Sequence, residues 1–299
     1  MKILVTGAAG QLGSDLVCEL SRSGHEAVGV DIGQMDITDA GSVRRVMEEV
    51  RPEAVIHCAA WTAVDAAEDP ANYEKVRLVN ADGTAHIAEC CRMLGCRMMY
   101  ISTDYVFDGQ GDTPWDPDCR SFAPLNVYGK TKLEGELAVC NLLTDYFIVR
   151  IAWVFGRHGG NFVRTMLNIG KKRDKLTVVN DQIGTPTYTP DLARLLADMI
   201  VTDRYGCYHA TNEGGYISWY CFAKEIFSQA AALGFAEYEE DRLAVLPVTT
   251  AEYGLSRAAR PFNSRLDKSK LAARGFTPLP DWKDALARYL KELADAGEI

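Results

Sequence analysis

The sequence has no long hydrophobic run. After Met1 and Lys2 the first apolar run, Ile3–Thr6, is too short for the core of a secretory signal peptide. No segment approaches the roughly 18 consecutive apolar residues that a membrane-spanning helix needs. These absences predict a cytoplasmic protein.

Blocks of basic residues are also absent. The chain has 41 acidic and 32 basic residues, which gives a formal net charge of −9. The resulting field repels polyanions such as nucleic acids and anionic membranes. We therefore expect a small-molecule substrate, with neither a nucleic acid nor a membrane as partner.

The spacings typical of metal sites are missing too. The nine cysteines include no Cys-x-x-Cys pair, and the five histidines form no His-Glu-x-x-His pattern. An odd number of cysteines also argues against a disulfide framework. We predict no metal site, and we expect Cys18 and Cys58, which lie in apolar runs, to be buried reduced thiols.

The 299 residues do contain a regular alternation of strands and helices. Apolar, β-branched runs predict strands at 2–6, 27–31, 54–59, 97–102 and 147–151, and helical periodicity appears at 13–23, after Asp39, and at 73–94 and 126–139. This order predicts an α/β protein with a doubly wound parallel sheet and helices on both faces.

The rhythm changes after Ile151, where elements become shorter and aromatics more frequent. Helices are expected at 191–200 and 281–293, the second with Trp282, Ala285, Leu286, Tyr289 and Leu293 on one stripe. We predict a first domain over 1–150, to which a segment near 165–200 returns, and a second, smaller α/β domain over 151–299.

A glycine-rich turn joins the first predicted strand to the first helix. Gly7 permits a tight turn, Gly10 lets backbone N–H groups approach a pyrophosphate, and Gly13 permits close helix–strand packing. Asp31 ends the second strand, where a carboxylate can accept from a ribose hydroxyl. The alternatives are a purely structural turn and, for Asp31, a solvated loop residue.

Two further patterns carry chemistry. Tyr128 and Lys132 share one helix face, so the ammonium can lie near the phenol and favour its phenolate, as general acid catalysis at an alkoxide requires. Ser102, Thr103 and Asp104 end a parallel strand, where ligands bind in such sheets. The alternatives are an exposed helix face and a capped turn.

Together and in this order, these patterns resemble the extended short-chain dehydrogenase/reductase family (Rossmann fold). Within it the chain is similar to the branch that reduces the 4-keto group of dTDP-4-dehydro-L-rhamnose to give dTDP-L-rhamnose for cell-wall polysaccharide. Further strings at 59–65 with Glu68, and at 124–135, 150–153, 180–186 and 260–264, carry that likeness.

The resemblance implies an NADPH- or NADH-dependent oxidoreductase, with residues 1–150 binding the cofactor and 151–299 mainly the dTDP-sugar. By the family pattern, the catalytic residues are Thr103, Tyr128 and Lys132. The implied cofactor-binding residues are Gly7, Gly10, Gln11, Leu12, Gly13, Asp31, Asp36, Ile37, Ala59, Ala60, Thr62, Tyr128 and Lys132. The implied substrate-binding residues are Val64, Thr103, Asp104, Tyr105 and Trp153, for the last of which a core position is the alternative.

Other assignments stay open at this stage. Asn161, Gln182, Arg260 and Arg265 are candidates for the nucleotide on polarity alone. Another nucleotide-sugar epimerase or reductase, or a non-catalytic regulatory subunit resembling the partner of methionine adenosyltransferase, would share the fold. The sequence sets neither the choice between monomer and homodimer nor the preferred cofactor, and because 187–190 has no carboxylate we carry over no magnesium site.

Overall fold

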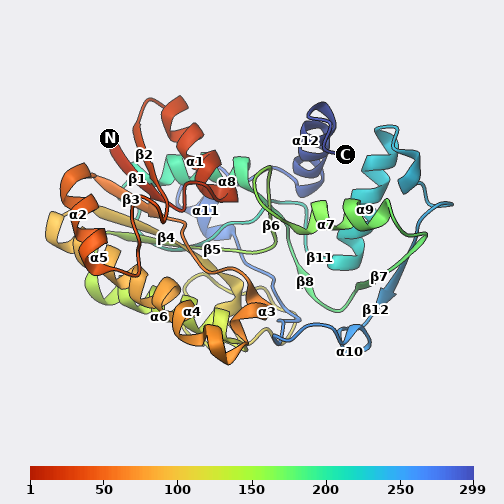
Figure 1. The fold of residues 1–299 in the computed structure, drawn as a ribbon, viewed down its shortest axis with the longest axis horizontal. Helices are drawn as coiled ribbons and strands as arrows, with labels where there is room; N and C mark the ends of the chain where they lie inside the picture. The colour runs from red at the N-terminus through yellow and green to blue at the C-terminus, as the bar shows by residue number, and fades with distance from the viewer.

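The computed structural model describes residues 1–299 and has a six-stranded parallel sheet at its centre (Figure 1). In space the strands follow the order β10-β5-β4-β3-β1-β2. Their bounds are β1 Lys2–Thr6, β2 Glu26–Val30, β3 Ala54–His57, β4 Arg97–Thr103, β5 Tyr146–Ile151 and β10 Gly206–His209. The predicted doubly wound α/β fold is confirmed.

Helices cover both faces of this sheet. The longer helices of the whole chain are α1 Gln11–Arg22, α2 Ala40–Val50, α5 Gly83–Leu94, α6 Val127–Leu142, α7 Phe162–Gly170, α8 Thr189–Ile200, α9 Trp219–Ala232 and α12 Trp282–Asp295, of which α7, α9 and α12 pack away from the main sheet. The short ones are α3 Val64–Ala67, α4 Tyr73–Arg77, α10 Thr250–Tyr253 and α11 Ser269–Ala273. None of them combines the length and hydropathy that a membrane crossing requires.

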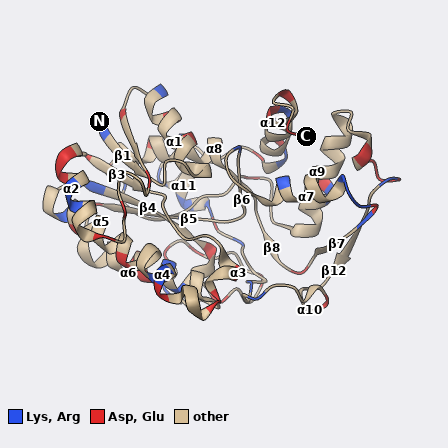
Figure 2. Cartoon of the chain, in the orientation of Figure 1, with Lys and Arg blue, Asp and Glu red and all other residues tan.

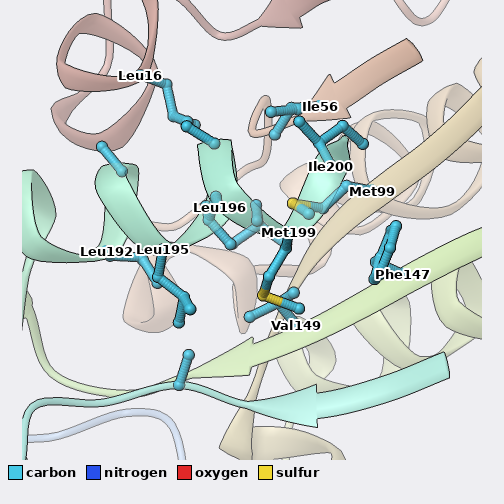
Figure 3. Close-up of a cluster of buried hydrophobic side chains, with 14 of the residues drawn as sticks. Leu16, Ile56, Met99, Phe147, Val149, Leu192, Leu195, Leu196, Met199 and Ile200 are labelled. Carbon is cyan, nitrogen blue, oxygen red and sulfur yellow. The ribbon is translucent and has the colours of Figure 1, made fainter. Parts of the chain in front are cut away.

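The alternation of side chains along the strands explains why the main sheet has one apolar core on each face. Ile3 and Val5 of β1 point to the face that α1 and α8 cover, and Leu4 points to the opposite face, under α2 and α5. Figure 3 shows Leu16 of α1 and Leu196 of α8 in the first of these cores, beside side chains from the strands. Figure 2 shows basic and acidic residues interspersed over the outer helices and loops.

The second lobe lies beyond the carboxyl ends of the strands (Figure 1) and has an aromatic core of its own. Outside the main sheet the chain forms three two-stranded sheets. These are β6 Val154–Phe155 with β9 Thr187–Tyr188, β7 Lys175–Val179 with β12 Ala244–Val248, and β8 Ile183–Gly184 with β11 Ile217–Ser218. The predicted stripe of the last helix is buried in this core. The chain returns to the main sheet through α8 and β10.

Two local expectations need correction. The predicted helix over 73–94 contains a π-helical turn at Leu78–Asp82, where the buried Asn80 side chain bonds to both the N–H and the carbonyl of Trp61. Cys18 is exposed, because it lies on the side of α1 opposite Leu16 and Leu20, and Cys58 is only half-buried. All nine cysteines are free thiols.

Candidate functional site

One cavity of about 820 Å³ opens at the carboxyl ends of β1 and β3, between which the order of the sheet reverses. This is where ligands bind in doubly wound sheets. Every residue that the sequence analysis singled out as catalytic, cofactor-binding or substrate-binding lines it. The other lining residues include Thr6, Ser102, Phe162, Trp219 and Arg260.

The glycine-rich turn forms one end of the cavity. Gly7 has φ +66°, and a Cβ there would lie 2.8 Å from the backbone nitrogen of Ala59. A Cβ on Gly13 would overlap the carbonyl of Gly7. Because Gly10 offers no side-chain cap to α1, the first amides of that helix are left for a ligand. This backbone cradle fits a pyrophosphate.

Two carboxylates lie at the same end. Asp31 accepts hydrogen bonds from the backbone N–H groups of Ala9 (3.0 Å) and Ile32 (2.9 Å), so it also ties the glycine-rich turn to the end of β2. Asp36 accepts from the N–H and the hydroxyl of Thr38. Both line the cavity, where their remaining acceptor capacity suits ribose hydroxyls or an adenine amino group.

Buried polar groups behind the loop after β3 hold Ala59 in place. The hydroxyl of Thr6 accepts from Ala59 N–H (3.2 Å) and bonds to His57 (2.7 Å). Burial lowers the pKa of His57 to about 3, so its ring is neutral. Sequence reasoning assigned no role to these residues, since a polar residue inside an apolar strand was the only available signal.

Tyr128 stands in the first turn of α6. Asn126 caps this helix by accepting from Gly129 N–H, and Glu68 accepts from Val127 N–H (2.8 Å). Burial raises the pKa of the Tyr128 phenol above its ordinary value, and a hydrogen bond with Thr103 opposes the shift. The phenol therefore keeps its proton at neutral pH.

Lys132 lines the cavity with Tyr128, and its ammonium is anchored by the strand beneath α6. Its Nζ donates to the carbonyl of Ile101 at 2.7 Å and lies 4.0 Å from the centroid of the Tyr100 ring. Burial lowers the pKa of this ammonium to about 7, although the charge of Glu136 raises it. The acceptor carbonyl comes from β4, so the four-residue spacing of Tyr128 and Lys132 within the helix could not predict the bond.

Thr103 and Asp104 end β4 close to Tyr128. The Thr103 hydroxyl donates to Asp104 Oδ1 (3.0 Å) and accepts from Tyr105 N–H (3.2 Å). Burial raises the pKa of Asp104 to about 6, and its Oδ2 is buried with no partner, as is the hydroxyl of Ser102. Both residues line the cavity, together with Thr103 and Tyr128.

A second cation lines the cavity beside Tyr105. Of the residues lining the cavity, only Lys132 and Arg260 are basic. Arg260 donates to the Tyr105 hydroxyl (3.2 Å) and to Asp65 (2.7 Å), and the Tyr105 and Tyr128 rings meet edge to face at 5.5 Å. An arginine held in this way can bind the oxygens of a phosphate.

The other polar candidates for the nucleotide do not line the cavity. Asn161 caps α7, and its amide donates to Gly156 and Tyr289. Gln182 is buried and donates to Thr250, while Arg265 donates to Asn263. Trp153 and Val64 line the cavity with Trp219, which sequence reasoning missed.

The whole chain is similar to known proteins in sequence and in structure. A family model described as the RmlD substrate binding domain matches residues 1–295. A dTDP-4-dehydrorhamnose reductase of Streptomyces griseus is 43% identical over 97% of this chain and 93% of the relative. A dTDP-4-keto-6-deoxy-D-glucose reductase of Streptomyces niveus is 38% identical over 95% of each. The crystal structure of a Bacillus anthracis dTDP-4-dehydrorhamnose reductase in complex with NADP has a TM-score of 0.89 and 41% identity, covering 98% of this chain and all of that one.

Proposed function

This chain belongs to the family of the RmlD substrate binding domain, and we propose that it uses NADPH or NADH to reduce the 4-keto group of dTDP-4-dehydro-L-rhamnose. The observation that supports this most is that one cavity is lined by the protonated, buried Tyr128, by the glycine-rich turn and by Arg260. The names of its full-length relatives support an NAD(P)H-dependent oxidoreductase of dTDP-rhamnose synthesis.

The residues at the first end of the cavity suit a dinucleotide. The amides of Gln11 and Leu12 would hold the pyrophosphate, which Gly10, whose own amide donates to the Gly7 carbonyl (3.0 Å), would let approach, and Asp31 would hold the adenosine ribose. Gly7 and Gly13, Asp36 and Ile37, and Ala59, Ala60 and Thr62 would complete the cofactor site. When bound, the reduced nicotinamide supplies the hydride that the keto carbon accepts.

Tyr128 would act as the general acid. As the C4 carbonyl gains negative charge, its oxygen would take the phenolic proton, and the Thr103 hydroxyl, turning its proton from Asp104 to this oxygen, would stabilise it by a hydrogen bond. Lys132 would hold the nicotinamide ribose, and its charge there would help the phenol to release the proton. Each role requires the residue at the cavity wall, where all three lie.

The second end of the cavity would hold the dTDP-sugar. Arg260 would pair with the diphosphate, since no other cation lines that end. Val64, Asp104, Tyr105 and Trp153 would surround the sugar. We propose a division of labour in which 1–150, with the returning segment, bind the cofactor, and 151–299 mainly the nucleotide sugar.

Tyr105 favours reduction over the dehydration that sister enzymes catalyse. Dehydratases must protonate a leaving hydroxyl and usually carry Thr-Asp-Glu where this chain has Thr103, Asp104 and Tyr105. Burial raises the pKa of Tyr105 to about 12, which makes it a poor acid for that step. A net charge of −9 supports a small-molecule substrate, and we propose a cytoplasmic monomer or homodimer that binds neither nucleic acid nor membrane.

A turnover assay tests this function. Purified protein is incubated with NADPH or NADH and, in parallel, with dTDP-4-dehydro-L-rhamnose, dTDP-4-keto-6-deoxy-D-glucose or dTDP-glucose. We expect consumption of reduced cofactor in step with dTDP-L-rhamnose, no dehydration of dTDP-glucose, and little nicotinamide retained after extensive dialysis. A protein that keeps a full equivalent of cofactor and interconverts sugars without consuming more would be an epimerase, and no turnover would favour a regulatory subunit.

A further inference from the structure

Two stacked indoles form one wall of the cavity. The rings of Trp153 and Trp219 lie with their centroids 3.7 Å apart at an angle of 15°, and both residues line the cavity. Trp219 comes from α9, 66 positions further along the chain. The contact therefore joins the end of the main sheet to the second lobe.

The backbone at Trp153 is strained. Its φ is +52°, and the only other non-glycine residue with a positive φ is Arg51, which ends α2 in an ordinary left-handed cap. A bulky residue rarely adopts this conformation unless its surroundings hold it there. The neighbours of the Trp153 ring must therefore fix its position.

Residues on β8 and α9 hold the Trp153 ring in this position. On β8, a Cβ at Gly184 would lie 2.9 Å from Cε2 of Trp153, so the indole occupies the space that a side chain would need. Trp219 covers the ring by stacking and is itself backed by Phe162, whose ring centroid is 4.5 Å away. Both of these aromatic neighbours also line the cavity.

The base of Trp219 is fixed by hydrogen bonds. Ser218, the cap of α9, accepts from Cys221 N–H (3.1 Å) and donates to Asn180 Oδ1 (2.6 Å). The first residue of a capped helix has little freedom to move. The Trp219 indole is therefore held in a fixed position, and the Trp153 ring stacks on it.

We propose that Trp219 is a positioning residue for the sugar, because its indole holds the strained Trp153 ring as a flat apolar wall of the sugar site. This inference rests on the proposed function, in which Trp153 faces the sugar. An apolar wall orients a ligand when a few polar groups fix its other side, as Thr103 and Tyr128 would. Without Trp219, the Trp153 backbone could relax and the sugar carbonyl would move relative to Tyr128.

The test compares Trp219→Leu and Trp219→Phe with the wild-type protein. For Trp219→Leu we expect kcat/KM for dTDP-4-dehydro-L-rhamnose to fall about 10- to 100-fold, as for a small misplacement of a reacting group. The dissociation constant of NADPH should change less than about twofold, since Trp219 acts on the sugar. Trp219→Phe keeps a flat ring and should restore kcat/KM to within about threefold.

A double-mutant cycle tests whether Trp219 acts through Trp153. In a Trp153→Leu background, either change at Trp219 should cause little further loss in kcat/KM, because there is no indole left to support. Trp115→Phe is the matched control, since Trp115 stacks on Phe107 (4.5 Å) away from the cavity and should leave kcat/KM unchanged.

Several outcomes would overturn the inference. These are an unchanged kcat/KM in Trp219→Leu, an equal loss of NADPH affinity, or additive losses in the cycle. If Trp219→Leu does not fold, Trp219→Phe decides the question. We expect it to lower kcat/KM slightly in the wild-type background and not at all in the Trp153→Leu background. Absence of wild-type turnover would remove the proposed function and this inference together, whereas normal turnover with unaffected variants removes only the inference.

Discussion

Breaking the buried ion pair between α6 and β5 should destabilise the protein far more than breaking an exposed ion pair. Arg150 of β5 donates to Glu136 of α6 through Nε (2.8 Å) and Nη2 (2.7 Å), and the two side chains are 0% and 2% exposed. The substitution Glu136→Gln keeps the shape of the side chain and removes its charge. It leaves the Arg150 cation buried without a counterion.

The magnitude follows from what Arg150 retains. Removing one partner of a fully buried pair costs about 3 to 5 kcal/mol in the free energy of unfolding. Arg150 still donates to the carbonyl of Pro117 (3.2 Å) and lies 5.1 Å from the centroid of the Phe107 ring, and a glutamine oxygen can accept one of the two lost bonds. We therefore expect the lower end of the range, about 3 kcal/mol.

Urea unfolding followed by circular dichroism and tryptophan fluorescence measures this loss. Glu48→Gln is the matched control, because Glu48 forms an exposed pair with Arg44 and should show no measurable change. Glu136→Gln combined with Arg150→Met should recover most of the stability, because the uncompensated charge is gone. A loss in Glu136→Gln no larger than in the control, or no recovery in the double variant, would refute the reasoning.

Three further predictions concern catalysis and the cofactor. Tyr128→Phe should lower kcat by about 10²- to 10⁴-fold with nearly unchanged cofactor binding, measured by steady-state kinetics and titration, and retention of half the rate would rule out Tyr128 as the acid. Burial holds the pKa of Lys132 at about 7, so NADPH affinity, titrated across neutral pH, should fall as the pH rises above that value, and a flat profile would contradict a charged role. Because Asp31 repels a 2′-phosphate and no arginine follows it before Met35, both cofactors should support turnover without strong preference for NADPH; a preference above about a hundredfold in kcat/KM would show that Asp31 is turned away from the ribose.

The part of the fold that local sequence could predict is the part with a clear period. The apolar strands and amphipathic helices of residues 2–151 lie close to their expected positions. The reason is that apolar residues recur with a period of 2 in a strand buried on one face and with a period of 3.6 in an amphipathic helix. Strand β10, Gly206–His209, carries no such signal. It has four residues and becomes a sheet strand only because β5 offers it an edge.

The candidate site shows the same limit. Residues at strand ends and in the glycine-rich turn could be placed from sequence, since backbone geometry demands their type there. The hydrogen bond of Lys132 to Ile101 and the stacking of Trp153 on Trp219 could not, because each depends on a segment distant in the chain. Exposed Cys18 shows that an apolar run does not tell which side of a helix is buried.

The late position of β10 has a consequence for synthesis on the ribosome. β5 ends at Ile151, but its outer edge is paired only by Gly206–His209, and α8, which covers one face of the sheet, ends at Ile200. A nascent chain that has emerged only as far as Ile151 therefore presents an unpaired edge and an uncovered apolar face at the same time. Unpaired strand edges and exposed apolar faces favour wrong association between chains. We therefore expect the nascent chain to be most prone to aggregation during the synthesis of the next 60 or so residues, until β10 can pair with β5.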